Sequence, residues 1–134
     1  MRLTINIALV SALGALLAGC ALGPFGGDLQ SAREACNHAY PPRIGNYRPH
    51  ADCVNAAVER YALPTSPYPD LIRLQEEVRS ALSDKVDRRR IAVRDGERRM
   101  AEADRLVAAA ERDRAAGNEK AASRRIAAIE EMLR

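Results

Sequence analysis

Two cysteines and two histidines flank one short segment of the chain. Cys36 and His38 precede the segment, and His50 and Cys53 follow it. Thiolate and imidazole are the ligand types of structural zinc sites, so these four side chains could together hold a metal ion. Their spacing is unlike the usual Cys-x2-Cys and His-x3-His pairs. Oxidation of the two thiols to a disulfide is the competing chemistry.

Two short helices are expected to carry these residues. Asp28 suits the N-cap of a first helix, which should end near Tyr40 because the Pro41-Pro42 pair forbids its continuation. A second helix is expected from about Pro49 to Ala62, since proline is tolerated in a first helical turn. Residues 28–63 therefore predict an antiparallel helical hairpin.

The hairpin places Cys36 opposite Cys53, because the two residues stand almost symmetrically about its loop. Outside the cytosol, two such thiols are expected to be oxidised. A helical pair of this size has too little core to be stable alone, and a disulfide restricts the unfolded chain. We therefore expect a Cys36–Cys53 disulfide and no metal cofactor, with zinc bound by Cys36, His38, His50 and Cys53 as the alternative.

The third cysteine follows an apolar N-terminal stretch. An apolar run from Leu3 to Ala18 follows one basic residue, Arg2. The last two residues of this run begin the sequence Leu17-Ala18-Gly19-Cys20. A charged start, a short apolar core and small residues before a cleavage site are typical of a secretory signal peptide. The apolar run is 16 residues long, and a transmembrane helix needs about 20. The sequence thus predicts a signal peptide over residues 1–19.

The ending Leu17-Ala18-Gly19-Cys20 resembles the lipobox of bacterial lipoproteins. The resemblance implies cleavage before Cys20 and covalent lipid on that residue, which would anchor the chain to a membrane. Residues 20–27 would then form a lipidated, flexible tether rich in glycine. In lipoproteins that this chain resembles, Asp after the lipidated residue favours the inner membrane. Ala21 stands there, so we expect the periplasmic face of the outer membrane, with the inner membrane as the alternative.

The C-terminal half has a different pattern. Residues 64–69 read as a stiff, proline-rich linker, and no proline follows Pro69. From residue 70 onward, apolar residues recur with the 3.6-residue period of an amphipathic helix rather than the 3.5 of a strict coiled coil. We call this stripe the seam; it is interrupted at Arg89 and Gly96 and consists of Leu71, Leu74, Val78, Leu82, Val86, Val93, Met100 and Val107.

Residues 70–134 are therefore expected to form a charged amphipathic helical arm. Gly117-Asn118 is a break signal, since Gly ends helices and Asn caps them. We expect residues 119–134 to fold back there, and an uninterrupted rod to Arg134 is the alternative. The predicted fold is all-α: a short helical hairpin stapled by a disulfide, then a long amphipathic helix with a turn near Gly117.

The composition narrows the class of function. Residues 70–134 carry 16 basic and 14 acidic side chains, a near balance that, together with export, argues against binding to nucleic acid. No phosphate-binding loop or Gly-x-Ser-x-Gly motif occurs, so we expect no enzyme. The sequence favours a small lipid-anchored envelope protein with a structural or protein-interaction role. A periplasmic ligand- or metal-binding lipoprotein, using the Cys36 to Cys53 region, is the alternative.

The expected contact surface of this protein is the seam. A narrow apolar stripe on a charged helix buries too little area to be stable alone. We expect it to be covered by residues 119–134, by a second copy of the chain or by another envelope protein.

Overall fold

The computed structural model describes residues 28–134. Within that range it contains, in chain order, α1 (Leu29–Ala39), α2 (Tyr47–Tyr61), the 3-10 turn η1 (Leu63–Thr65), α3 (Pro69–Asp87), α4 (Val93–Ala115) and α5 (Glu119–Glu131). No strand occurs among these residues, which confirms the predicted all-α class. The predicted signal peptide over residues 1–19, the lipidation of Cys20 and the tether over residues 20–27 lie outside the described residues.

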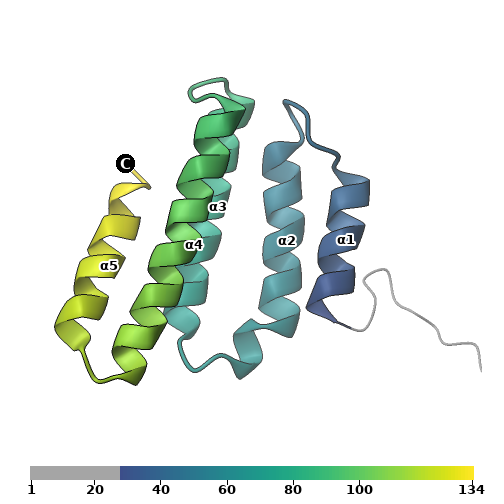
Figure 1. The fold of residues 1–134 in the computed structure, drawn as a ribbon. Helices are drawn as coiled ribbons and strands as arrows, with labels where there is room; N and C mark the ends of the chain where they lie inside the picture. The colour runs from purple at the N-terminus through teal and green to yellow at the C-terminus, as the bar shows by residue number, and fades with distance from the viewer. Residues whose placement is uncertain (1–27) are drawn as a thin grey trace, which may run out of the picture.

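The helices run alternately up and down, and each one packs against the next along the chain (Figure 1). α1 and α5 lie at opposite edges of the array, and α3 lies behind α4 in this view. The α1–α2 and α3–α4 loops meet at the upper end, whereas η1 and the α4–α5 turn lie at the lower end. α5 contacts both α4 and α3, so the last three helices form a small bundle.

Helix α1 begins and ends where its sequence predicts. The Asp28 carboxylate accepts a hydrogen bond from the backbone N–H of Ser31 at 2.8 Å, which is the expected N-cap contact. The helix ends at Ala39, just before the two prolines. The hairpin prediction is thereby confirmed at its first helix.

The start of α2 is capped by a residue from another helix. Asn46 makes no side-chain cap, and the carboxylate of Asp87 accepts from the backbone N–H groups of Gly45 (2.6 Å), Tyr47 (3.3 Å) and Arg48 (2.8 Å) instead. A carboxylate at a helix N-terminus satisfies free donors and complements the helix dipole. This contact fixes the end of α3 against the α1–α2 loop.

Residues 64–69, predicted as an extended linker, do not hold the two halves apart. Their first part belongs to η1, and α3 already begins at Pro69. Ile72 of α3 packs against the cluster of Cys36, Val54 and Val58. The hairpin and the C-terminal arm therefore pack directly against each other.

The arm begins as two helices, where the sequence predicts one long helix. α3 stops at Asp87, and Arg89 adopts the left-handed conformation with φ 56°. The N–H of Arg89 bonds to the carbonyl of Val86 and the N–H of Arg90 to that of Lys85, both at 2.8 Å. This pair of bonds is the Schellman motif, which reverses the chain so that α4 returns along α3.

The turn near Gly117 is confirmed. Gly117 has φ 72° and bonds to the carbonyl of Arg114, while the N–H of Asn118 bonds to Asp113 at 2.8 Å. The side chain of Asn118 then accepts from the N–H of Ala121 and caps α5. The chain therefore folds back here and does not continue as a rod.

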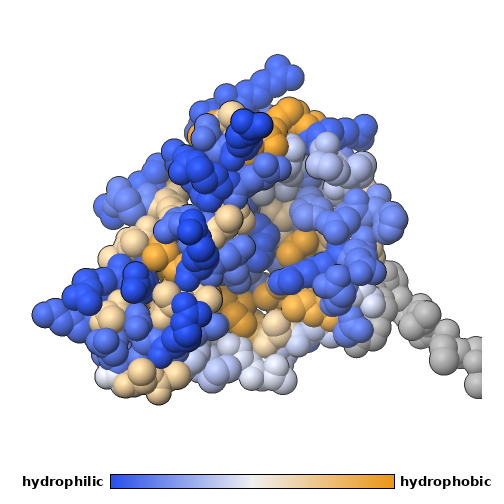
Figure 2. Space-filling view, viewed as in Figure 1, coloured by the Kyte–Doolittle hydropathy of each residue, from blue (hydrophilic) through white to orange (hydrophobic). Residues whose placement is uncertain are grey.

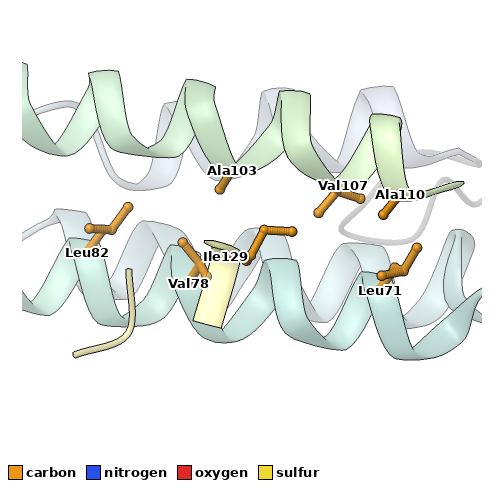
Figure 3. Close-up of a cluster of buried hydrophobic side chains, with 7 residues drawn as sticks. All are labelled: Leu71, Val78, Leu82, Ala103, Val107, Ala110 and Ile129. Atoms are coloured by element: carbon orange, nitrogen blue, oxygen red, sulfur yellow. The ribbon is translucent and has the colours of Figure 1, made fainter. Parts of the chain in front are cut away.

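These two turns enclose most of the seam. Residues of α3, α4 and α5 form a buried cluster of Leu71, Val78, Leu82, Ala103, Val107, Ala110 and Ile129 (Figure 3). Val86 is 2% exposed, and Leu74 and Met100 pack against the cluster. Gly96 lets α4 approach α3, since a Cβ there would lie 2.7 Å from Val86 Cγ2. The seam is thus covered by residues 119–134, as one alternative predicts, and by its own second half.

Candidate functional site

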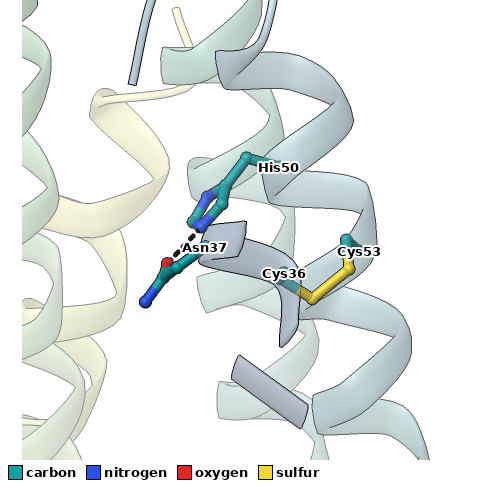
Figure 4. Close-up of a disulfide and its surroundings, with 4 residues drawn as sticks. All are labelled: Cys36, Asn37, His50 and Cys53. Carbon is teal, nitrogen blue, oxygen red and sulfur yellow. Dashed lines mark hydrogen bonds between the residues drawn. A yellow bond between two sulfur atoms is a disulfide. The ribbon is translucent and has the colours of Figure 1, made fainter. Parts of the chain in front are cut away.

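Cys36 and Cys53 form the predicted pair. Their Sγ atoms are 2.06 Å apart and their Cα atoms 5.8 Å apart, which is disulfide distance. The pair joins α1 to α2 (Figure 4), and Cys36 is fully buried beside Val54 and Val58. The two sulfur atoms are bonded to each other, so neither cysteine is a free thiolate in this structure.

The two histidines predicted as possible ligands have other surroundings. His50 Nε2 lies 2.8 Å from Asn37 Oδ1, across the α1–α2 interface (Figure 4). His38 lies exposed near the end of α1. Within residues 28–134, no group of three or more His, Cys, Asp or Glu side chains is arranged to hold a metal ion.

A groove of about 430 Å³ lies between α2 and α4, with α3 as its floor. Figure 2 shows orange, apolar surface between the blue, charged side chains of this face. The groove is lined mainly by apolar side chains, namely Val54, Leu82, Val86, Val93, Met100 and Ala101. Small-molecule sites in proteins commonly have about 300–1,000 Å³ and such a lining. We therefore take this groove as the candidate functional site.

Two basic side chains line the groove from neighbouring helices. Arg79 of α3 donates a hydrogen bond to Asn55 Oδ1, and no carboxylate within residues 28–134 forms an ion pair with it. Burial lowers the pKa of Arg79, against the attraction of Asp104. Burial also lowers the pKa of His50, and the charge of Arg79 lowers it further. The groove thus contains a guanidinium that lacks a close counter-ion.

Two carboxylates of α4 complete the polar part of the lining. Asp104 accepts a hydrogen bond from Gln75 Nε2 at 2.7 Å, and Glu97 is exposed at the edge. Positive charge therefore lies on the α3 side, at Arg79, and negative charge on the α4 side. Sequence reasoning missed Arg79, Glu97 and Asp104 as site residues, because they meet only after α4 folds back along α3. The sequence analysis did single out His50, as a possible ligand, and four apolar groove residues as part of the seam, namely Leu82, Val86, Val93 and Met100.

One acidic side chain outside the groove is buried. Glu76 of α3 is 7% exposed, and its Oε1 has no hydrogen-bond partner among the described residues. Burial raises the pKa of the Glu76 carboxyl, and the nearby charge of Glu59 raises it further. The folded protein therefore favours the protonated form more than the unfolded chain does.

Replacing Glu76 with Gln is expected to stabilise the protein at neutral pH by about 1 kcal/mol, because an unsatisfied buried charge is removed. Since the folded-state pKa is raised, Glu76 destabilises the fold increasingly as pH rises through and above 4.5, its ordinary value. The advantage of the Gln variant should therefore disappear as pH falls toward that value. Urea denaturation at several pH values measures both effects.

Glu77→Gln is the matched control, since Glu77 is the exposed neighbour of Glu76 on the same helix. It should leave stability nearly unchanged at every pH. Equal stability of wild type and Glu76→Gln at neutral pH would contradict a buried charge at this position.

The described residues define an all-α protein of alternating antiparallel helices, with a mixed-charge groove across its central helix. Among residues 28–134, no helix combines the length and the apolar character needed to cross a membrane. Comparison of the chain with protein-family models, with curated proteins and with solved structures finds no match.

Proposed function

We propose that this chain is a small lipid-anchored envelope protein with a structural or interaction role. In this proposal it acts by binding another envelope component in the groove between α2 and α4, and not by catalysis. The anchor rests on the lipobox-like Leu17-Ala18-Gly19-Cys20 and the tether over residues 20–27. The binding role rests on the groove.

The binding role rests on the location of the apolar surface that remains accessible to solvent. Leu71, Val78 and Val107 of the seam pack inside the bundle, so this part of the seam does not supply a surface for a partner. Within residues 28–134, Ile44 is the one large apolar side chain that is strongly exposed, at 42%. Two partly exposed residues of the seam, Val93 and Met100, line the groove together with Tyr47 of α2. Concave apolar surface with a few polar groups is the usual form of a binding site.

The anchor is tested by replacing Cys20 with Ala. The variant should fail to incorporate labelled fatty acid and should leave the outer-membrane fraction, because its only lipid attachment point is lost. Ala21→Asp is the matched control: it should still take up the label but move to the inner membrane. Continued labelling of Cys20→Ala would refute the lipoprotein assignment.

The binding role is tested in cells that produce the protein with a photoreactive amino acid at one chosen position. At Ala101, which is exposed in the groove, irradiation should attach one discrete protein or lipid component. At Arg112, an exposed residue of the same helix outside the groove, it should attach none. Equal patterns from both positions would refute the groove as the contact surface.

A further inference from the structure

We propose that the groove binds an amphiphile with one apolar chain and a singly charged anionic head group. The chain lies along the apolar end of the groove, and the head group pairs with Arg79. This inference rests on the proposed function only in taking the groove as the contact surface, and it does not depend on lipidation of Cys20.

The apolar end of the groove lies where three helix ends meet. Tyr47 is the first residue of α2, Val86 lies in the last turn of α3, and Val93 is the first residue of α4. Val86 and Val93 with Leu82 and Met100 form a continuous apolar lining. An alkyl chain placed there would replace water on these side chains, which is favourable in proportion to the apolar area covered.

The charged end lies two helical turns away along α3. Arg79 precedes Val86 by seven residues, which corresponds to roughly 10 Å along a helix axis. His50 of α2 lies close enough for its charge state to respond to Arg79, and Arg33 of α1 adds positive potential at the same place. One end of the groove is therefore mainly apolar, and the other end is positive on the α3 side, at Arg79.

The unpaired guanidinium explains why the head group should be an anion. A partly buried charge is costly unless it is paired, and the amide oxygen of Asn55 is a neutral partner for Arg79. A carboxylate or phosphodiester oxygen would make charge-assisted hydrogen bonds with the free N–H groups of the guanidinium. Such bonds are about twice as strong as those between neutral groups.

The carboxylates of α4 limit the charge of the head group. Asp104 and Glu97 line the opposite side, and Asp104 attracts Arg79 electrostatically. A dianion beside Arg79 would be repelled by Asp104, and a cation would be repelled by Arg79. A head group with one negative charge fits between these limits, whether it belongs to a free fatty acid or to a phosphodiester lipid with one chain.

The test uses the unlipidated mature chain, residues 20–134 with Cys20→Ala, which retains every described helix and the whole groove. Displacement of a fluorescent polyene fatty acid is measured below the micelle concentration of each competitor. The competitors are dodecanoate, lysophosphatidylglycerol, dodecyl phosphate, dodecanol and dodecyltrimethylammonium. We expect saturable displacement by one or both singly charged anions, which identifies the source of the head group, and weaker displacement by the other three.

Variants assign the binding to named side chains. Arg79→Gln should weaken binding of the preferred anion by about tenfold and leave dodecanol unaffected. Arg112→Gln removes an exposed arginine of α4 outside the groove and should change neither ligand. Ala101→Trp fills the groove from an exposed position and should weaken all ligands.

Three results would overturn the proposal. They are the absence of saturable binding by either singly charged anion, equal or tighter binding of the dianion, the alcohol or the cation, and unchanged anion binding in Ala101→Trp. If Arg79→Gln does not fold, as judged by circular dichroism, Arg79→Lys and the competitor series decide the charge requirement. Fatty-acid labelling of Cys20 is a separate readout, so a failed anchor and a failed groove are distinguishable.

Discussion

Replacement of Cys53 with Ser is expected to lower the free energy of unfolding by about 2–5 kcal/mol. The bond joins α1 to α2 across a sequence separation of 17 residues, and it lies in the cluster that Val54 and Val58 form with α3. Without it, the unfolded chain gains freedom, and α1, which lies at one edge of the array, loses its covalent link to α2. Urea denaturation of the unlipidated mature chain measures the change in midpoint.

The double variant Cys36→Ser and Cys53→Ser is the control for chemistry of a remaining free thiol. Addition of a reductant should lower the stability of wild type to that of the double variant, and should not affect the double variant itself. If the midpoint of wild type is the same with and without reductant, the disulfide does not contribute to stability.

Replacement of Val107 with Glu is expected to cost several kcal/mol, because it places an unpaired charge inside the bundle. Val107 is 6% exposed and belongs to the same cluster as Leu71, Val78 and Ile129. Since these partners lie in the same chain, the variant should unfold as a monomer, with a midpoint that does not depend on protein concentration. Thermal unfolding followed by circular dichroism tests this.

Arg112→Glu on the exposed side of α4 is the matched control and should change stability by less than about 0.5 kcal/mol. Sedimentation at several concentrations distinguishes an internal from an intermolecular role of Val107. If Val107→Glu stays fully helical and is as stable as Arg112→Glu, then Val107 is not buried in the cluster of α3, α4 and α5.

The sequence predicts those parts of the fold that have a local chemical signal. Asp28 and the Pro41-Pro42 pair mark the ends of α1, and Gly117 supplies the left-handed residue at the end of α4. The placement of Cys36 and Cys53 about one loop predicts their pairing, because antiparallel helices bring such positions together. Each of these features depends on a few neighbouring residues.

The break between α3 and α4 has no such signal. The same Schellman motif ends α3 and α4, but Arg89 takes the position that Gly117 takes in the second turn. A left-handed residue other than glycine costs about 1–2 kcal/mol, so sequence rules do not propose one. The seam also keeps its period across the break. Periodicity shows which face of a helix is apolar, but it does not show which residues cover that face. The antiparallel pairing with α4 compensates for the strained residue.

The groove could not be predicted for the same reason. Arg79 and Asp104 are 25 positions apart in the sequence, and they line one groove only because the chain reverses between them. On the predicted single helix, both would read as solvated charges of an exposed face. Among the polar groove residues, the sequence analysis singled out only His50, as a possible metal ligand, whereas Leu82, Val86, Val93 and Met100 were predicted as part of the seam.

The alternating order of the helices also bears on how the chain folds. Within residues 28–134, each α-helix packs on the α-helix that follows it, and α3 with α5 is the one pairing that skips a neighbour. Contacts between segments close in sequence need little loop-closure entropy, and chains with low contact order fold fast. The hairpin of α1 and α2 can therefore fold first, and its disulfide can form while α4 and α5 are still unfolded.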